Sequence, residues 1–303
     1  MAITDQDVKA LREMTGVGMM DCKKALAASD GDMDKAVEWL REKGLAASAK
    51  KAGRIAAEGM AYACVIDGVG VVVEVNAETD FVGKNEKFVD FVKGVASTVA
   101  ACAPADLDAL MECKYSGTDL TVTQQQQEMV LVIGENIKVR RFARFADGTS
   151  VPYIHAGGKI GVLVNLEVTG GIDATEVGKD MAMQIAALNP RFLDKSQVTQ
   201  DVLDEEKKIL LAQMDNDPKM ASKPAQVKEK IVEGKLNKFY AENCLLQQTF
   251  VKDNDVTVEQ YMNAAAKKLG GAITLKDAVR FEKGEGIEKK QENFAEEIAK
   301  LAQ

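Results

Sequence analysis

The chain has 303 residues, with 39 Lys and Arg against 47 Asp and Glu, so its formal net charge is −8. Hydrophobic residues make up 46% and charged residues 28% of the chain, which is typical of a globular protein and excludes disorder as its main state. The net negative charge counts against direct binding of nucleic acid, because such binding requires a positive surface.

The N-terminal residues and the cysteines bear on location. Residues 1–14 (MAITDQDVKALREM) carry charges where a signal peptide has an apolar segment, and no run of about 18 apolar residues occurs in the chain. The five cysteines form no CxxC pair, and their odd, scattered number indicates reduced thiols. We therefore expect a cytoplasmic protein without a membrane-spanning segment.

Few residues are available for enzyme chemistry. His155 is the only histidine, which leaves one way to build a Ser/His/Asp triad and excludes a metal site rich in histidine. The sequence has no GxSxG, no GxxxxGK[ST] phosphate loop and no GxGxxG after a strand. We expect no covalent chemistry, no metal and no cofactor. The alternative is a cysteine-dependent enzyme that uses Cys22 with His155 as its base.

The N-terminal segment, residues 1–44, has the pattern of three short helices. Thr4 is a good N-cap for the first helix, and a second helix is expected at about 19–28. Gly44 stands where a C′ glycine ends the third helix. The following residues, 45–57, are small and basic and predict a helical or flexible linker.

An internal repeat organises the rest of the chain. Residues 62–73 align with residues 153–164, and each copy reads as two apolar strands around a glycine-containing turn. A helical pattern follows each hairpin. Residues 137–148 align with residues 273–284 as a third strand in each half.

These patterns predict an α+β fold with two repeated subdomains, each a small antiparallel sheet covered by helices. The first subdomain is expected at 58–149 and the second at 150–284. Residues at about 191–243 have no counterpart in the first half and predict an inserted antiparallel, coiled-coil-like helical hairpin. A C-terminal helix module is expected at 285–303.

The two halves also differ after their hairpins. The segment 75–95 is longer than its counterpart, and the excess lies in a polar loop that contains Asp80 and Phe81. A phenylalanine in such a loop either folds back as a lid on its own core or serves as an aromatic anchor for another protein. The residues alone leave both interpretations open.

Two stretches of this sequence resemble the hallmark motifs of the translation elongation factor Ts family. They are residues 11–26 (LREMTGVGMMDCKKAL) and residues 74–82 (EVNAETDFV). The order of the segments also resembles that family over essentially the full chain. Three departures are Ala77, where cysteine or serine is common, Gly83, where alanine is common, and a helical hairpin that is somewhat long for the family.

The resemblance implies a guanine-nucleotide exchange factor that binds the GTPase elongation factor Tu. The N-terminal module would be ubiquitin-associated-like and would touch the GTPase domain through Arg12, Met19, Met20 and Lys23. For the two methionines, packing in the helix core is the alternative. The resemblance leaves open a homodimer or a 2:2 complex with the partner.

The same resemblance assigns roles to a loop and to one core residue. In the segment Thr79, Asp80, Phe81 and Val82, the phenylalanine would insert between helices of the GTPase domain while the aspartate helps to disturb its magnesium site. His155 matches a core position that faces the partner, or else is a satisfied structural residue. The rival function is a scaffold that binds partner helices or ubiquitin-like domains through the N-terminal module.

Overall fold

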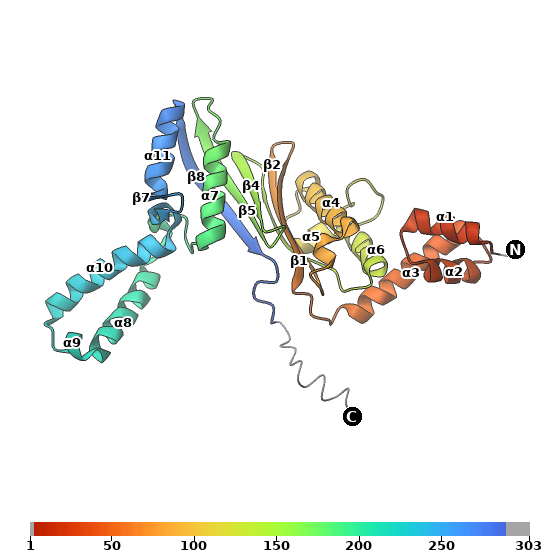
Figure 1. The fold of residues 1–303 in the computed structure, drawn as a ribbon, viewed down its shortest axis with the longest axis horizontal. Coiled ribbons are helices and arrows are strands. Elements are labelled where there is room, and N and C mark those ends of the chain that lie inside the picture. The colour runs from red at the N-terminus through yellow and green to blue at the C-terminus, as the bar shows by residue number, and fades with distance from the viewer. Residues whose placement is uncertain (1–2, 289–303) are drawn as a thin grey trace.

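Two three-stranded antiparallel sheets form the centre of the molecule in the computed structural model, which describes residues 3–288 (Figure 1). Their strand orders are β1–β2–β3 and β4–β5–β8. The repeat predicted from the sequence is therefore confirmed, with two hairpins and a third strand beside each. The strands are β1 (Glu58–Ile66), β2 (Val69–Ala77), β3 (Lys138–Phe145), β4 (Thr149–His155), β5 (Ile160–Thr169) and β8 (Ala272–Glu282).

The two sheets pack against each other through small residues. Ala61 and Ala63 of β1 share a buried cluster with Leu163 and Phe281 of the second sheet. A Cβ atom on Gly161 would lie 3.1 Å from the carbonyl carbon of Ala61, so a larger residue there would push the sheets apart.

Helices cover the outer face of each sheet. The helix α4 (Glu86–Cys102) packs on β1 and β2, and α7 (Thr175–Leu188) packs on β4 and β5. Both end at a residue with positive φ just before a proline. The remaining covering helices are α5 (Leu107–Glu112), α6 (Val122–Ile133) and α11 (Val258–Leu269).

Three helices precede the first sheet, as predicted: α1 (Asp5–Thr15), α2 (Met19–Ala28) and α3 (Met33–Lys51). Thr4 caps α1 in a capping box with Asp7. Leu11, Leu26 and Leu40 are buried together between the helices. We call this unit the three-helix bundle.

The predicted helix end at Gly44 is wrong. The helix α3 continues through Gly44 to Lys51, so the first part of the expected linker is helical. Gly44 is buried against α6, and a Cβ atom there would lie 3.3 Å from the carbonyl oxygen of Gln127. This glycine permits close packing of two helices instead of ending one.

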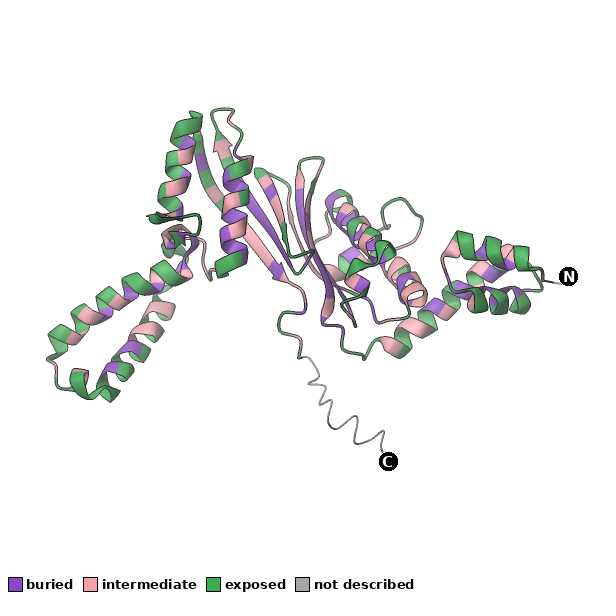
Figure 2. Ribbon diagram, viewed as in Figure 1, coloured by how far each residue is buried: buried purple, intermediate pink, exposed green. Residues whose placement is uncertain are grey.

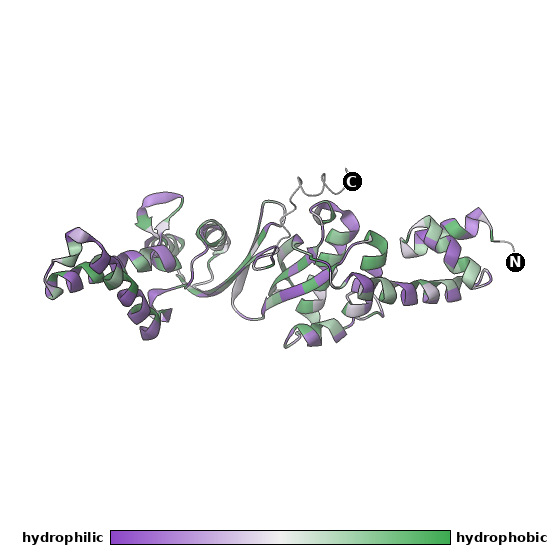
Figure 3. Ribbon diagram, turned by 90° about the horizontal axis from the view of Figure 1, so that it is seen from below, coloured by the Kyte–Doolittle hydropathy of each residue, from purple (hydrophilic) through white to green (hydrophobic). Residues whose placement is uncertain are grey.

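The inserted segment forms the predicted helical hairpin, with α8 (Gln200–Asn216), α9 (Pro218–Ala221) and α10 (Ala225–Asn243). Its surface is mostly exposed (Figure 2), and a small apolar cluster around Met214 and Leu236 joins its helices. The hairpin and the three-helix bundle lie at opposite ends of the molecule (Figure 3). Short elements complete the fold: β6 (Thr249–Phe250), β7 (Asp253–Thr257), η1 (Val82–Lys84), η2 (Lys195–Gln197) and η3 (Leu245–Gln247). The helix expected within 285–303 falls almost entirely outside the described residues.

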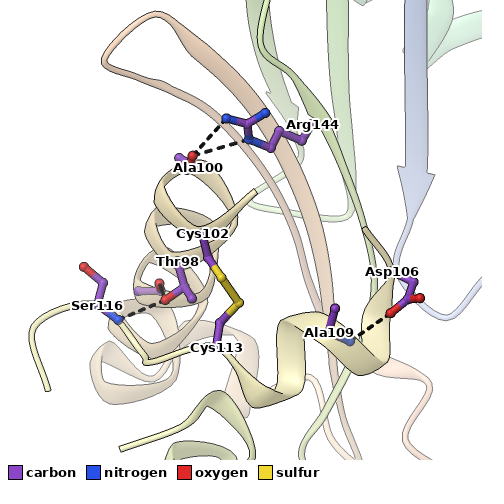
Figure 4. Close-up of a disulfide and its surroundings, with 9 residues drawn as sticks. Thr98, Ala100, Cys102, Asp106, Ala109, Cys113, Ser116 and Arg144 are labelled. Atoms are coloured by element: carbon purple, nitrogen blue, oxygen red, sulfur yellow. Dashed lines mark hydrogen bonds between the residues drawn. A yellow bond between two sulfur atoms is a disulfide. The ribbon is translucent and has the colours of Figure 1, made fainter. Parts of the chain in front are cut away.

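The expectation that all five cysteines are reduced is contradicted. Cys102 and Cys113 form a disulfide (Figure 4). They are 11 positions apart, and their Cα atoms come within 6.5 Å because α4 ends at the first and α5 ends just before the second. Cys22, Cys64 and Cys244 are free. Over residues 3–288, the structure contains no helix with the length and apolar character needed to cross a membrane.

Candidate partner-binding site

One carboxylate fixes the start of the loop that holds Asp80 and Phe81. The hydroxyl of Thr79 donates to Oε1 of Glu135 at 2.7 Å, and the Thr79 amide donates to Oε2 at 3.0 Å. The amide of Glu78 donates to the same Oε2 at 3.1 Å. Glu135 directly follows Gly134, whose positive φ of 84° ends α6 and turns the chain toward the loop.

The far side of the loop is fixed as well. Val82 is buried in the core of the first subdomain. Gly83 passes so close to β1 that a Cβ atom would lie 2.9 Å from the Gly59 carbonyl oxygen. Asn85 then caps α4, with its side-chain oxygen accepting from the amides of Lys87 and Phe88. The loop is therefore anchored on both sides of Asp80 and Phe81.

Between these anchors, Phe81 is 80% exposed, so the interpretation that it forms a lid on its own core is wrong. Asp80 is exposed too. A cavity of about 280 Å³ adjoins the phenylalanine, lined by Asn85, Lys87 and the end of α6 among others. A large apolar side chain presented to solvent from a fixed backbone is a common feature of protein-binding surfaces.

The predicted site residues of the three-helix bundle also face solvent. Arg12 lies on α1 and Lys23 on α2, and both are exposed. Met19 and Met20, at the start of α2, are 55% and 67% exposed. The alternative that these methionines pack in the helix core is therefore wrong.

A direct contact joins the two predicted motifs. The ammonium of Lys87, the second residue of α4, donates to the carbonyl oxygen of Gly16 at 3.1 Å. Gly16 lies in the turn between α1 and α2, within the first motif. A cavity of about 300 Å³ beside this contact is lined by residues of both parts, including Thr15 and Tyr115.

His155 lies elsewhere, at the exposed end of β4. Its Nδ1 atom is 3.0 Å from the hydroxyl of Tyr153. The turn that follows it rests on β1, because the Ala61 amide donates to the Gly158 carbonyl at 2.8 Å. The histidine thus has a hydrogen-bond partner and is also open to solvent, and both of its predicted roles stay predictions.

The structure gives no support to a cysteine-dependent enzyme. Cys22 is fully buried in the core of the three-helix bundle, and burial raises the pKa of its thiol. Such a thiol is a poor nucleophile, because little of it ionises near neutral pH. In the part of the chain that is described, His, Cys, Asp and Glu side chains form no cluster suited to holding a metal ion.

Two supporting residues of the site are missing from the sequence prediction. Glu135 and Lys87 both act across long stretches of chain, 56 positions to Thr79 and 71 to Gly16. Each resembles an ordinary surface charge in the sequence. The only available signal was the position of Lys87 close after the longer loop.

Comparison with known proteins identifies the class. The family model described as "Elongation factor TS" matches residues 78–285. The protein called elongation factor Ts from Trichlorobacter lovleyi is 50% identical, with 100% of this chain and 99% of the relative covered. Those from Syntrophotalea carbinolica and from Clostridium perfringens strain SM101 are 46% and 50% identical, with 99% of both sequences covered in each case.

These matches and the mixed α+β fold define a translation elongation factor, a protein of protein biosynthesis. The chain belongs to the elongation factor Ts family.

Proposed function

We propose that this chain is a cytoplasmic guanine-nucleotide exchange factor that binds elongation factor Tu in its GDP form and releases the GDP so that GTP can bind. The observation that supports this most strongly is Phe81, 80% exposed on a loop anchored on both sides. Exchange requires no bond to be made or broken in the protein. A set of nucleophile, base and metal is therefore not needed.

Exchange of this kind is a matter of linked binding. The factor must bind the nucleotide-free GTPase more tightly than the GDP-bound form, and reciprocity then makes it weaken GDP binding by the same ratio. A ten-thousandfold shift needs about 5.5 kcal/mol of differential contact. The exposed loop and the three-helix bundle are the surfaces that would supply it.

The loop would act on the partner's magnesium site. Phe81 would insert between helices of the GTPase domain, with Thr79 and Val82 holding the backbone on either side. The carboxylate of Asp80 would then disturb the magnesium ion, which neutralises the phosphates of GDP. Loss of that neutralisation weakens the bound nucleotide.

The other predicted residues would extend the contact. Arg12, Met19, Met20 and Lys23 would touch the GTPase domain from a ubiquitin-associated-like bundle, and His155 would face the partner from the second subdomain. The acidic chain would bind neither nucleic acid nor a membrane. Each chain offers one such surface, which fits a 1:1 complex or a 2:2 complex built on a homodimer.

The test is release of a fluorescent GDP analogue from purified elongation factor Tu in excess unlabelled GDP. A substoichiometric amount of this chain should accelerate the release and turn over many times. The rival function is a scaffold that binds helices or ubiquitin-like domains through the three-helix bundle. A complex that forms on gel filtration while release stays at its spontaneous rate would favour that scaffold.

A further inference from the structure

We infer that Lys87 is a positioning residue that couples the three-helix bundle to the Asp80–Phe81 loop, so that both meet one partner in a fixed relative placement. The inference rests on the proposed function for its effect on nucleotide release. The contact itself belongs to the free chain and can be tested without a partner.

The bundle is attached to the rest of the molecule mainly along one helix. The helix α3 packs on α6, where Arg41 lies 3.3 Å from the Glu128 carboxylate. Further along α3, the Lys51 ammonium donates to the Gly134 carbonyl at 2.6 Å. These polar contacts follow the axis of α3, away from the opposite side of the bundle, where α1 and α2 meet. Leu131 and Val132 of α6 also pack against the apolar core of the bundle.

Lys87 supplies a restraint at that opposite side. Its ammonium donates to the Gly16 carbonyl, which lies at the C-terminal end of α1 where the helix dipole is negative and favours a cation. Gly16 has a φ of 68°, and a Cβ atom on it would lie 2.7 Å from the Lys87 ammonium. A glycine at position 16 therefore permits both the positive φ of the turn and the close approach of the Lys87 ammonium.

The same lysine, at the start of α4, also contacts the exposed loop. Its backbone amide donates to the Asn85 side chain at 3.0 Å, and its side chain lines the cavity beside Phe81. On the other side of the contact, Val17 and Gly18 follow Gly16, and Met19 then begins α2. One side chain thus connects the turn between α1 and α2 with the start of α4.

This connection has a consequence for binding. Two recognition elements that engage one partner bind more tightly when their separation is already correct, because less freedom is lost on association. Loss of the Lys87 contact should therefore weaken complex formation and leave the rate of release from the assembled complex nearly unchanged.

The first experiment measures nucleotide release with Lys87→Met, which keeps most of the aliphatic side chain and removes the donor. The concentration of the chain that gives half-maximal release should rise roughly three- to tenfold, with the saturating rate within about twofold of wild type. Lys87→Arg keeps a charged donor, so its half-maximal concentration should lie close to that of wild type. Lys93→Met is the matched control, since Lys93 pairs with Asp90 on the same helix, at 3.7 Å.

A double-mutant cycle separates positioning from direct contact with the partner. If Lys87 acts through the bundle, Lys87→Met should add little once Met19 and Met20 are both replaced by alanine. Full additivity of the two changes would overturn the inference, because it would mean that the lysine contacts the partner independently.

Hydrogen exchange of the free chain gives an independent readout. In Lys87→Met, the amides of residues 12–20 should exchange faster than in wild type, while those of α10 remain unchanged. Unchanged exchange in residues 12–20 would overturn the inference. If wild type fails to accelerate GDP release, the proposed function falls, and hydrogen exchange still decides whether Lys87 restrains the bundle.

Discussion

Thr79 is bound by Glu135 through both its backbone and its side chain, at 3.0 Å and 2.7 Å. The two residues lie 56 positions apart: Thr79 lies between β2 and α4, and Glu135 follows the end of α6. The carboxylate thereby fixes the backbone immediately before Asp80 and Phe81. The exposed aromatic side chain is presented from a rigid base, which lowers the entropy lost on binding.

Glu135→Gln tests whether the Glu135 carboxylate holds the loop in place. The amide keeps one acceptor oxygen and turns a donor toward the donors of Glu78 or Thr79, so nucleotide release should slow about tenfold. The free energy of unfolding should fall by only about 1–2 kcal/mol. Stopped-flow release and urea unfolding measure the two effects. Glu233→Gln, at an exposed position on α10, serves as the control; equal release rates for both variants would contradict the role of Glu135.

Glu74 should make stability depend on pH. This buried carboxylate accepts from Arg140, Arg141, Asn76 and the amide of Gly284, and so ties the end of β8 to the first sheet. Burial disfavours its ionised form, but the donors outweigh that effect and lower the pKa of Glu74 below its ordinary value of 4.5. The charged network is therefore a stabilising contact at neutral pH.

At pH 7, Glu74→Gln should cost about 3 kcal/mol of unfolding free energy, because two arginines lose their buried partner. Since the native pKa is lowered, the unfolded chain takes up this proton first as the pH falls. The contribution is complete above the ordinary value of 4.5 and is lost as the pH falls through the native pKa. Urea midpoints of wild type and variant should therefore converge at acid pH. A constant difference would contradict the assignment.

Met19 and Met20 should matter for binding and little for folding. Both side chains are more than half exposed, so replacing the pair by alanine should change the free energy of unfolding by under about 1 kcal/mol. Affinity for elongation factor Tu, measured by titration calorimetry, should fall about tenfold or more. An unchanged affinity together with a lowered melting temperature would show that they serve the bundle alone.

The disulfide gives a chemical prediction. Alkylation of the denatured, unreduced protein followed by mass spectrometry should modify Cys22, Cys64 and Cys244 only. After reduction, Cys102 and Cys113 should also react. Reduction opens the short loop that the disulfide closes, so the free energy of unfolding of the α5 segment should fall by up to about 3 kcal/mol. Five reactive thiols before reduction would contradict the pairing.

Regular patterns in the sequence predicted much of this fold. The repeated hairpins and the capped α1 each depend on neighbouring residues or on a period, which a sequence displays directly. Gly44 was misread because a glycine that ends a helix and a glycine that lets two helices touch look the same without the partner helix. The difference lies in Gln127, more than eighty positions away.

The candidate site also contains some features that the sequence could predict and others that only the structure could show. Comparison of the two halves located the longer loop with Asp80 and Phe81, but only the structure could show that Phe81 points to solvent. The supports of the site, Glu135 and Lys87, depend on approaches between distant segments. No local pattern distinguishes such residues from other surface charges.

The most direct test of the proposed function compares wild type and Phe81→Ala in release of the fluorescent GDP analogue from elongation factor Tu. Wild type should accelerate release. Phe81→Ala should reduce the catalysed rate about thirtyfold, the equivalent of about 2 kcal/mol, with an unchanged melting temperature. Leu269→Ala, at an exposed apolar position at the end of α11, should behave as wild type. Equal acceleration by wild type and Phe81→Ala would contradict the assignment of the loop, and no acceleration by wild type would contradict the exchange function itself.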